Sequence, residues 1–206
     1  MSYSYTQLFR DYLYSQEFQE PLKSSLEYIL FNEGHWVRPQ LVLAWCEYCG
    51  GNPVDALPFA LAIEYVHTAS LIHDDLPSMD NATERRGQEC LHLVYNEATA
   101  VLTGDALLNM AFTSILHSSL PAANKNYALA ILSEVNSSLC NGQLMELNIL
   151  PQLTELPDKI EQTLKIHSCK TADLIKGACL LGVAASGKLF AAQDAENFGF
   201  NLGMLY

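Results

Sequence analysis

Apolar residues fill long stretches of this chain, and the length of these stretches is typical of helices. Residues 38–49 form one such stretch, and the residues that follow it, Gly50 to Pro53, are typical of a helix end. Residues 55–75 form a second stretch, which is too continuously apolar for a surface helix and is therefore expected to be central. Further helices are expected over residues 97–120, 127–150 and 158–186, and from near residue 191 onward.

Strand signals are missing from the same pattern. The chain has no alternating runs rich in β-branched residues, no internal repeat and no obvious linker. The expected fold class is therefore all-α, with residues 1–206 forming a single domain.

Composition and charge narrow the range of possible functions. Half of the 206 residues are hydrophobic and 17% are charged, which excludes a disordered chain and an extended coiled coil. The net charge of −12 argues against nucleic-acid binding, because attraction to phosphates needs a basic face. It does not exclude a phosphorylated small molecule, since a few local cations or metal ions can outweigh the average charge.

The N-terminal residues and the cysteines indicate the compartment. No basic segment followed by an apolar stretch is visible at the start, and no run of 18 uncharged apolar residues occurs, so we expect a cytoplasmic protein without a transmembrane segment. Of the six cysteines, only Cys46 and Cys49 form a C-x-x-C pair, and no second pair with zinc spacing follows. The cysteines are expected to be small buried hydrophobic residues in a reducing environment.

Three carboxylates end the central apolar stretch. Asp74, Asp75 and Asp80 lie within seven residues and would repel one another unless a cation neutralised them. Hard oxygen donors at a helix end suit Mg²⁺, which binds through a few carboxylates together with substrate phosphate. On an uninterrupted helix Asp74 and Asp80 would point about 120° apart. Because Pro77 disfavours helix at the residue before it, the chain can turn and bring Asp80 back toward Asp74.

Basic residues accompany this acidic cluster. Arg85 and Arg86 follow it, and arginine grips phosphate oxygens with two parallel hydrogen bonds. His67 precedes Asp74 by seven residues, about 20° short of two helical turns, and therefore lies on the same helix face. A solvated helix cap followed by an ordinary Asp80-Asn81 turn would also explain the acids. The apolar helix, the third carboxylate and the arginine pair favour a metal-bridged diphosphate site instead.

The segment EYVHTASLIHDDLPSMDNATERRG, residues 64–87, resembles the first aspartate-rich motif of the trans-polyprenyl diphosphate synthases, the farnesyl and geranylgeranyl diphosphate synthase family. The resemblance extends over nearly the whole chain, through Gly34, Arg38-Pro39, Gly104-Asp105-Ala106-Leu107-Leu108, Gly142-Gln143, His167 and Lys170-Thr171. It implies a barrel-like bundle of long antiparallel helices around a deep apolar cavity, usually in a homodimer. It also implies the head-to-tail condensation of an allylic diphosphate with isopentenyl diphosphate, using Mg²⁺.

The resemblance also assigns roles to residues. Asp74 and Asp80 correspond to the magnesium ligands, with Asp75 in support. Arg85 corresponds to a residue that binds the allylic diphosphate. Lys170 and Thr171 reach the same diphosphate, and the lysine is placed to stabilise the departing charge. The residues that correspond to ligands of isopentenyl diphosphate are Arg38, His67 and Arg86.

The chain departs from the family in two places. His35, which is mostly neutral at pH 7, replaces a lysine, and Trp36 replaces an arginine, so a reduced affinity for isopentenyl diphosphate is expected. The chain also stops before the second aspartate-rich motif of the family, so we expect a fragment that lacks the C-terminal part of the fold. In the family, a bulky residue five positions before the first aspartate stops elongation, so small Ala69 at that position suggests room for a geranylgeranyl product. The two extra residues Pro77-Ser78 also occur in bacterial-type farnesyl synthases, so a farnesyl product stays open.

Two other functions remain open from the sequence. One is a non-catalytic partner subunit of an active prenyl synthase, favoured by His35, Trp36 and the missing second motif. The other is a related Mg²⁺-dependent terpene synthase. The arginine pair and Lys170-Thr171 argue against it, because a cyclase has no second diphosphate to bind.

Overall fold

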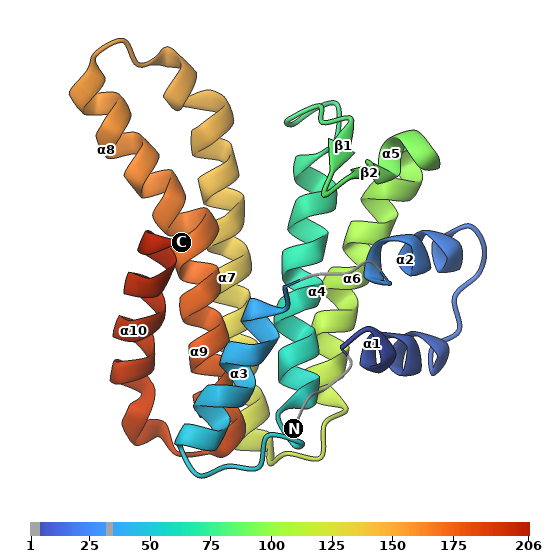
Figure 1. The fold of residues 1–206 in the computed structure, drawn as a ribbon, viewed down its shortest axis with the longest axis vertical. Coiled ribbons are helices and arrows are strands. Elements are labelled where there is room, and N and C mark those ends of the chain that lie inside the picture. Colours follow the sequence, from blue (N-terminus) through green and yellow to red (C-terminus); the bar gives the residue numbers. More distant parts are fainter. Residues whose placement is uncertain (1–4, 32–34) are drawn as a thin grey trace. The chain divides into compact units, whose positions relative to one another are not determined.

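The computed structural model describes residues 5–31 and 35–206, and in these residues the chain is almost entirely helical (Figure 1). The all-α prediction is therefore confirmed. The α-helices are α1 (Tyr5–Tyr14), α2 (Leu22–Leu30), α3 (Val37–Tyr48), α4 (Leu57–Asp74), α5 (Leu91–Val94), α6 (Glu97–Leu116), α7 (Ala122–Asn148), α8 (Leu156–His167), α9 (Asp173–Ser186) and α10 (Ala192–Leu205). Two 3₁₀ turns, η1 (Leu150–Gln152) and η3 (Leu189–Ala191), a π-helical turn, η2 (Ser168–Ala172), and two short strands, β1 (Glu84–Arg85) and β2 (Gln88–Glu89), complete the described elements.

Each long helix predicted from the apolar pattern is present, with ends that differ by a few residues. Two differences are elements that the apolar pattern did not predict. Helices α1 and α2 were not predicted, and the two strands contradict the expectation of a strand-free chain. A third difference lies within the helix predicted over residues 158–186, which the π-helical turn η2 divides into α8 and α9.

The chain divides into two compact units. The first comprises Met1–Trp36 and Tyr65–Met110. In it, α1 and α2 contribute buried apolar side chains such as Phe9 and Leu26, and the Ser25 hydroxyl lies 2.7 Å from the buried Thr103 hydroxyl of α6. The Tyr28 hydroxyl donates a hydrogen bond to the Glu89 carbonyl, which ties α2 to the β1–β2 hairpin.

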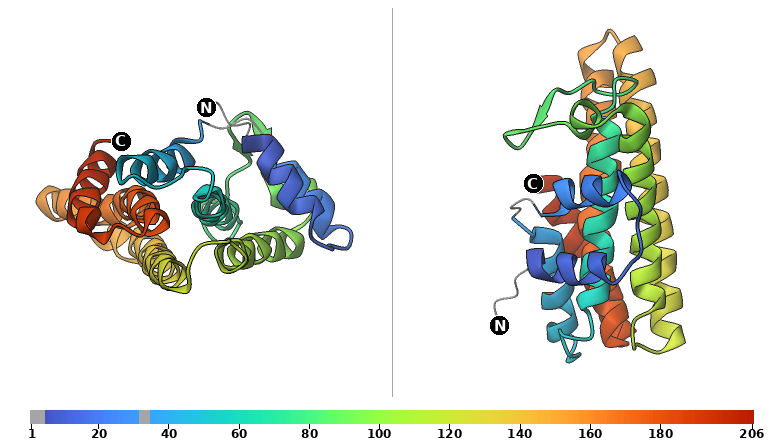
Figure 2. Two further views of the ribbon diagram at one scale, coloured as in Figure 1. Left: turned by 90° about the horizontal axis from the view of Figure 1, so that it is seen from below. Right: turned by 90° about the vertical axis from the view of Figure 1, so that its right-hand side faces the viewer.

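The second unit comprises Val37–Glu64 and Ala111–Tyr206, and α9 lies at its centre. Helices α3, α7 and α10 pack against α9, as the left view of Figure 2 shows. Residues 177–185 of α9 are all buried, which explains their continuous apolar sequence. His167, at the end of α8, donates a hydrogen bond from Nε2 to the Gly203 carbonyl of α10 at 3.0 Å, so the segment before η2 is also fixed to this unit. The prediction of one domain over residues 1–206 stays a prediction.

Helix α6 is the one helix in the described part of the chain that is long and apolar enough to cross a membrane. Half of its most apolar stretch is buried, as is common for the core helix of a globular protein. Length and composition alone do not show that the helix crosses a membrane. The six cysteines are all unpaired. Cys46, Cys49, Cys90 and Cys179 are buried as expected, whereas the expectation was wrong for Cys140, which is exposed, and for the half-buried Cys169.

Candidate functional site

The chain turns back on itself directly after α4. The Asp80 amide donates a hydrogen bond to the Asp74 carbonyl at 2.9 Å, and the Asn81 amide donates to the Leu76 carbonyl at 3.0 Å. Asn81 has a φ of 50°, a left-handed conformation that asparagine tolerates better than most residues. The turn expected around Pro77 is therefore present, and it returns Asp80 to the last residue of α4. Asp74 is half-buried and Asp80 is exposed.

Asp75 has a different role from its two neighbours. Its carboxylate is buried and accepts hydrogen bonds from Nε of Arg85 at 2.8 and 2.9 Å and from the terminal nitrogen of Arg85 at 2.6 Å. The hydrogen bond to Asp75 is the main cause that raises the pKa of Arg85. Asp75 therefore fixes the position of Arg85 on β1, and its oxygens are already engaged by a guanidinium group.

Arg86 lies in the turn between the two strands. Glu84 pairs with Glu89 and Arg85 with Gln88, so Arg86 and Gly87 are the two turn residues of the hairpin. Their φ angles are 55° and 79°, the positive values that a tight turn of type I′ requires. Arginine is an unfavourable residue there, and its terminal nitrogen lies 3.3 Å from Nε2 of the buried His67. Arg86 and His67 are two of the three residues predicted to bind isopentenyl diphosphate; the third is Arg38.

The donor chemistry at the end of α4 fits a magnesium ion. Magnesium in enzymes is commonly held by one or two carboxylates together with substrate phosphates and waters. Asp74 and Asp80 supply two carboxylates on one turn. Within the described residues no group of three or more histidine, cysteine, aspartate or glutamate side chains forms a metal cluster. The residues therefore fit an ion that takes its remaining ligands from water and substrate.

Lys170 and Thr171 lie in the π-helical turn η2, a feature that is frequent at functional sites. The Lys170 ammonium group donates a short hydrogen bond to the Gln143 side-chain oxygen and forms an ion pair with Glu146 at 2.6 Å. A Cβ atom added to Gly142 would lie 2.7 Å from Cγ of Lys170, so the glycine permits the close approach of α7 and η2.

Glu146 was missed in the sequence analysis. Its spacing of three residues from Gln143 on one face of α7 is the signal that could have identified it. Thr171 is half-buried beside Lys170.

The remaining predicted residues lie near the beginning of α3 and within α4. Arg38 is the second residue of α3 and is half-buried, whereas His35 is exposed. Gly34, quoted above as part of the family pattern, lies outside the described residues. Ala69 is completely buried in α4.

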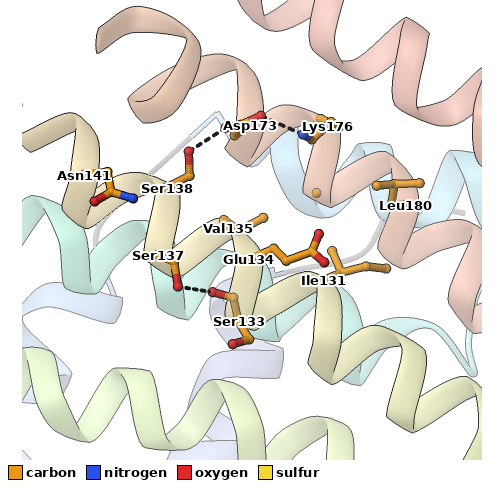
Figure 3. A pocket seen from close by; sticks show the side chains of 11 residues that line it. Ile131, Ser133, Glu134, Val135, Ser137, Ser138, Asn141, Asp173, Lys176 and Leu180 are labelled. Carbon is orange, nitrogen blue, oxygen red and sulfur yellow. Dashed lines mark hydrogen bonds and ion pairs between the residues drawn. The ribbon is translucent and has the colours of Figure 1, made fainter. Parts of the chain in front are cut away.

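A separate pocket of about 400 Å³ lies along α7 and α9 in the second unit (Figure 3). Asp173 accepts a hydrogen bond from the Ser138 hydroxyl at 2.5 Å and pairs with the Lys176 ammonium group at 2.7 Å. Ser138, Asp173 and Lys176 thus engage one another, and none of the predicted site residues lines the pocket.

The chain is similar to known proteins over most of its length. Residues 19–206 match the Polyprenyl synthetase family model. The chain is 37% identical to the farnesyl diphosphate synthase of Micrococcus luteus, over 91% of this chain and 64% of that protein. It is 42% identical to geranylgeranyl pyrophosphate synthase 9, chloroplastic, of Arabidopsis thaliana, over 81% of this chain and 47% of that protein. The chain thus spans about half to two thirds of the length of these relatives.

Solved structures agree with this match. A geranyltransferase from Legionella pneumophila superimposes with a TM-score of 0.86 at 32% identity, over 98% of this chain and 74% of that chain. A geranylgeranyl pyrophosphate synthetase from the archaeon Geoglobus acetivorans gives the same TM-score at 28% identity, over 97% of this chain and 63% of that chain. The helical fold is the one seen in these synthases. The chain belongs to the polyprenyl synthetase family.

Proposed function

We propose that this chain acts in a short-chain trans-prenyl diphosphate synthase, which joins an allylic diphosphate to isopentenyl diphosphate head to tail. The observation that carries the proposal is the Asp74–Asp80 turn together with the Arg85–Arg86 hairpin that Asp75 fixes beside it. Family membership supports it, as do relatives that are farnesyl and geranylgeranyl diphosphate synthases. The product proposed is farnesyl or geranylgeranyl diphosphate.

In the proposed reaction, two carboxylates bind the metal ion, and cationic and polar side chains bind the two diphosphates. Asp74 and Asp80 would hold Mg²⁺, which when bound supplies positive charge to the diphosphate leaving group. Arg85, Lys170 and Thr171 would bind the allylic diphosphate. Arg86, His67 and Arg38 would bind isopentenyl diphosphate, with the roles of all these residues taken from the family resemblance.

The proposed reaction requires little covalent chemistry from the protein. The allylic carbon–oxygen bond breaks, the isopentenyl double bond attacks the allylic carbon, and the released diphosphate is the natural acceptor of the final proton. The cations stabilise the negative charge that develops on the leaving group. An apolar surrounding protects the allylic cation from water, and the buried aliphatic and small side chains of α4, including Ala69 and Ile72, are suited to that task.

A non-catalytic partner subunit is the second candidate. His35 and Trp36 stand where the family has cations, which favours weaker binding of one substrate. One relative, 36% identical over 91% of this chain, is the large subunit 2 of a heterodimeric geranylgeranyl pyrophosphate synthase in Arabidopsis thaliana. Assembly as a homodimer and a cytoplasmic location remain predictions.

One incubation separates these functions. The protein is mixed with Mg²⁺, labelled isopentenyl diphosphate and, in turn, dimethylallyl, geranyl or farnesyl diphosphate, and the products are separated by chain length. An elongated diphosphate supports the proposal, and its length identifies the product. A cyclised hydrocarbon would instead identify a terpene synthase, and product that forms only after an active homologue is added would identify a partner subunit.

A matched pair of variants ties activity to the site. Asp80→Asn removes a proposed magnesium ligand and is expected to abolish elongation. Asp55→Asn removes an exposed carboxylate near the other end of α4 and is expected to leave elongation intact. Equal activity of the two variants would contradict the assignment of Asp80.

A further inference from the structure

Side chains of α1 contact Phe31, the residue after α2, and Trp36, the residue before α3. The Phe31 ring lies 6.2 Å from the Tyr14 ring, and the Arg10 guanidinium group lies over it at 4.6 Å. The Trp36 ring lies 5.0 Å from the Phe9 ring, at an angle of 36°. The family match begins at residue 19, so it assigns nothing to α1.

Trp36 has an unusual backbone. Its φ is 52°, in the left-handed region that bulky side chains rarely adopt. A residue keeps such a conformation only when its surroundings hold it there. Phe9 provides that contact, because it is completely buried and cannot turn away from the indole ring. The contact between Phe9 and Trp36 therefore holds Trp36 in place within the first unit.

The contacts extend from Phe9 to α4. The Phe9 ring lies 5.2 Å from the ring of Tyr65, which is also completely buried, and the Tyr12 ring lies 5.9 Å from the same Tyr65 ring. We call Phe9, Trp36 and Tyr65 the aromatic clamp. All three residues belong to the first unit.

Each end of the clamp is next to a residue proposed to bind isopentenyl diphosphate. Tyr65 precedes His67 by two residues on α4, and the His67 ring contacts Arg86. Trp36 follows the exposed His35 and precedes Arg38 by two residues. Within the first unit, the three rings thus connect the part of α4 that carries His67 to the residue that follows His35.

We propose that the aromatic clamp positions the first unit's binding residues for isopentenyl diphosphate, His67 and Arg86, with Phe9 and Trp36 as positioning residues. This inference rests on the proposed function. It gives Trp36 a role that a cation at the same position would not fill, because the indole ring packs against the buried Phe9. Loss of the clamp weakens the binding of isopentenyl diphosphate much more than that of the allylic diphosphate, because the proposed allylic ligand Arg85 is held by Asp75.

The test uses the fluorescence of Trp36 in the protein with Trp45→Phe, because the chain has 2 tryptophans and this change leaves Trp36 alone. Isopentenyl diphosphate and geranyl diphosphate are each titrated separately, with Mg²⁺ present, so binding is measured without turnover. Phe9→Ala removes the ring that holds Trp36, and Phe9→Leu keeps apolar volume at a completely buried position if the alanine variant fails to fold. Phe198→Ala is the matched control, because in the second unit it removes an aromatic partner of position 45 at a similar ring spacing of 5.7 Å.

The two substrates are expected to respond differently to the Phe9 variants. In Phe9→Ala and Phe9→Leu, the Kd for isopentenyl diphosphate rises about tenfold and the Kd for geranyl diphosphate changes by less than about twofold. The emission of Trp36 shifts to longer wavelength, since the indole loses an apolar neighbour. Phe198→Ala changes neither constant.

Two results overturn the inference. Equal weakening of both substrates would mean that Phe9 is merely structural, and unchanged affinity for isopentenyl diphosphate despite a shifted emission would mean that the clamp does not position its ligands. In both cases the proposed function survives, because the protein binds both diphosphates. If the protein without the Phe9 change binds neither diphosphate, the proposed function fails and the clamp's role fails with it.

Discussion

Arg85 and Lys170 are both cations held by a carboxylate, but the two pairs differ in how firmly they are held. Arg85 makes hydrogen bonds to both oxygens of Asp75, whose side chain is only 7% exposed. Lys170 pairs with one oxygen of Glu146, whose side chain is 41% exposed. A buried carboxylate has no solvent to replace its partner, whereas an exposed carboxylate is solvated when the lysine leaves.

The difference suggests two kinds of diphosphate ligand. If both cations bind diphosphate as proposed, Arg85 would receive the substrate as a fixed group. Lys170 would be exchangeable, because an arriving diphosphate would compete with Glu146 for its ammonium group. Four changes test this contrast, beginning with the largest expected effect.

Asp75→Ala should be the most damaging change. It leaves the half-buried Arg85 without its carboxylate and should lower the free energy of unfolding by about 2 kcal/mol, less than for a fully buried pair because Arg85 is partly exposed. Urea denaturation measures the loss. Glu84→Ala removes an exposed carboxylate from the same hairpin and should cost less than about 0.5 kcal/mol. If both variants lose the same stability, the Asp75–Arg85 pair does not fix the hairpin.

Gly142→Ala tests the packing behind Lys170. The added methyl group would lie 2.7 Å from Cγ of Lys170 and 3.0 Å from Cβ of Cys169, so α7 and η2 must move apart. The overpacking outweighs the better helix propensity of alanine, and thermal unfolding should report a loss of about 1 kcal/mol. Asn141→Ala, at the exposed preceding position, should not destabilise the protein. A stabilised Gly142→Ala variant would show that the two segments are not closely packed.

Glu146→Gln should affect binding more than stability. Because the ion pair is partly exposed, its loss should cost less than about 0.5 kcal/mol of unfolding free energy. Lys170 then becomes more available, and the KM for the allylic diphosphate should fall about twofold, while the KM for isopentenyl diphosphate stays constant. Steady-state kinetics with each substrate varied in turn measures this. A higher KM for the allylic substrate would mean that Glu146 orients Lys170 and does not compete for it.

The effect that is smallest near neutral pH is alkaline destabilisation through Cys90, which lies buried beside the Asp75–Arg85 pair. Burial, followed by the charge of Asp75, raises the pKa of Cys90 from 9.0 to about 11. The folded protein therefore keeps its proton where the unfolded chain loses it. Stability should be unaffected by this thiol below pH 8 and should fall as pH rises from about 9 to 11.

Chemical denaturation at several pH values should show a shallower fall for Cys90→Ala than for the unchanged protein. Cys169→Ala, which removes the half-buried thiol next to Lys170, is the control. If Cys90→Ala leaves the slope unchanged, the buried thiol does not contribute to it. Because Cys46 and Cys179 also have a raised pKa, part of the fall should remain in either variant.

The long helices were predictable because each carries an apolar pattern extended over several turns. The hairpin was not, since its strands have two residues each and contain no repeating pattern. The π-helical turn at residues 168–172 was also invisible, because inserting one residue into a helical turn alters hydrogen bonds and leaves the helical composition unchanged.

Some features of the candidate site could likewise be predicted from the sequence, and others could not. The turn that returns Asp80 to Asp74 could be predicted, because Pro77 and the helix angle are local properties. The role of Asp75 could not, since it depends on Arg85, ten residues further along and on a different element. Glu146 was missed for a similar reason, as its partner Lys170 lies 24 residues away.

The sequence by itself determined the helical class, the family, and the residue types that suit magnesium and diphosphate, because these depend on local pattern and on motif. Only the tertiary structure decided which acids pair with which cations. It also showed that a buried aromatic ring of α1 contacts Trp36, a residue with a left-handed backbone. Burial and pairing depend on contacts between segments far apart in the chain, and such contacts leave no periodic trace in a single sequence.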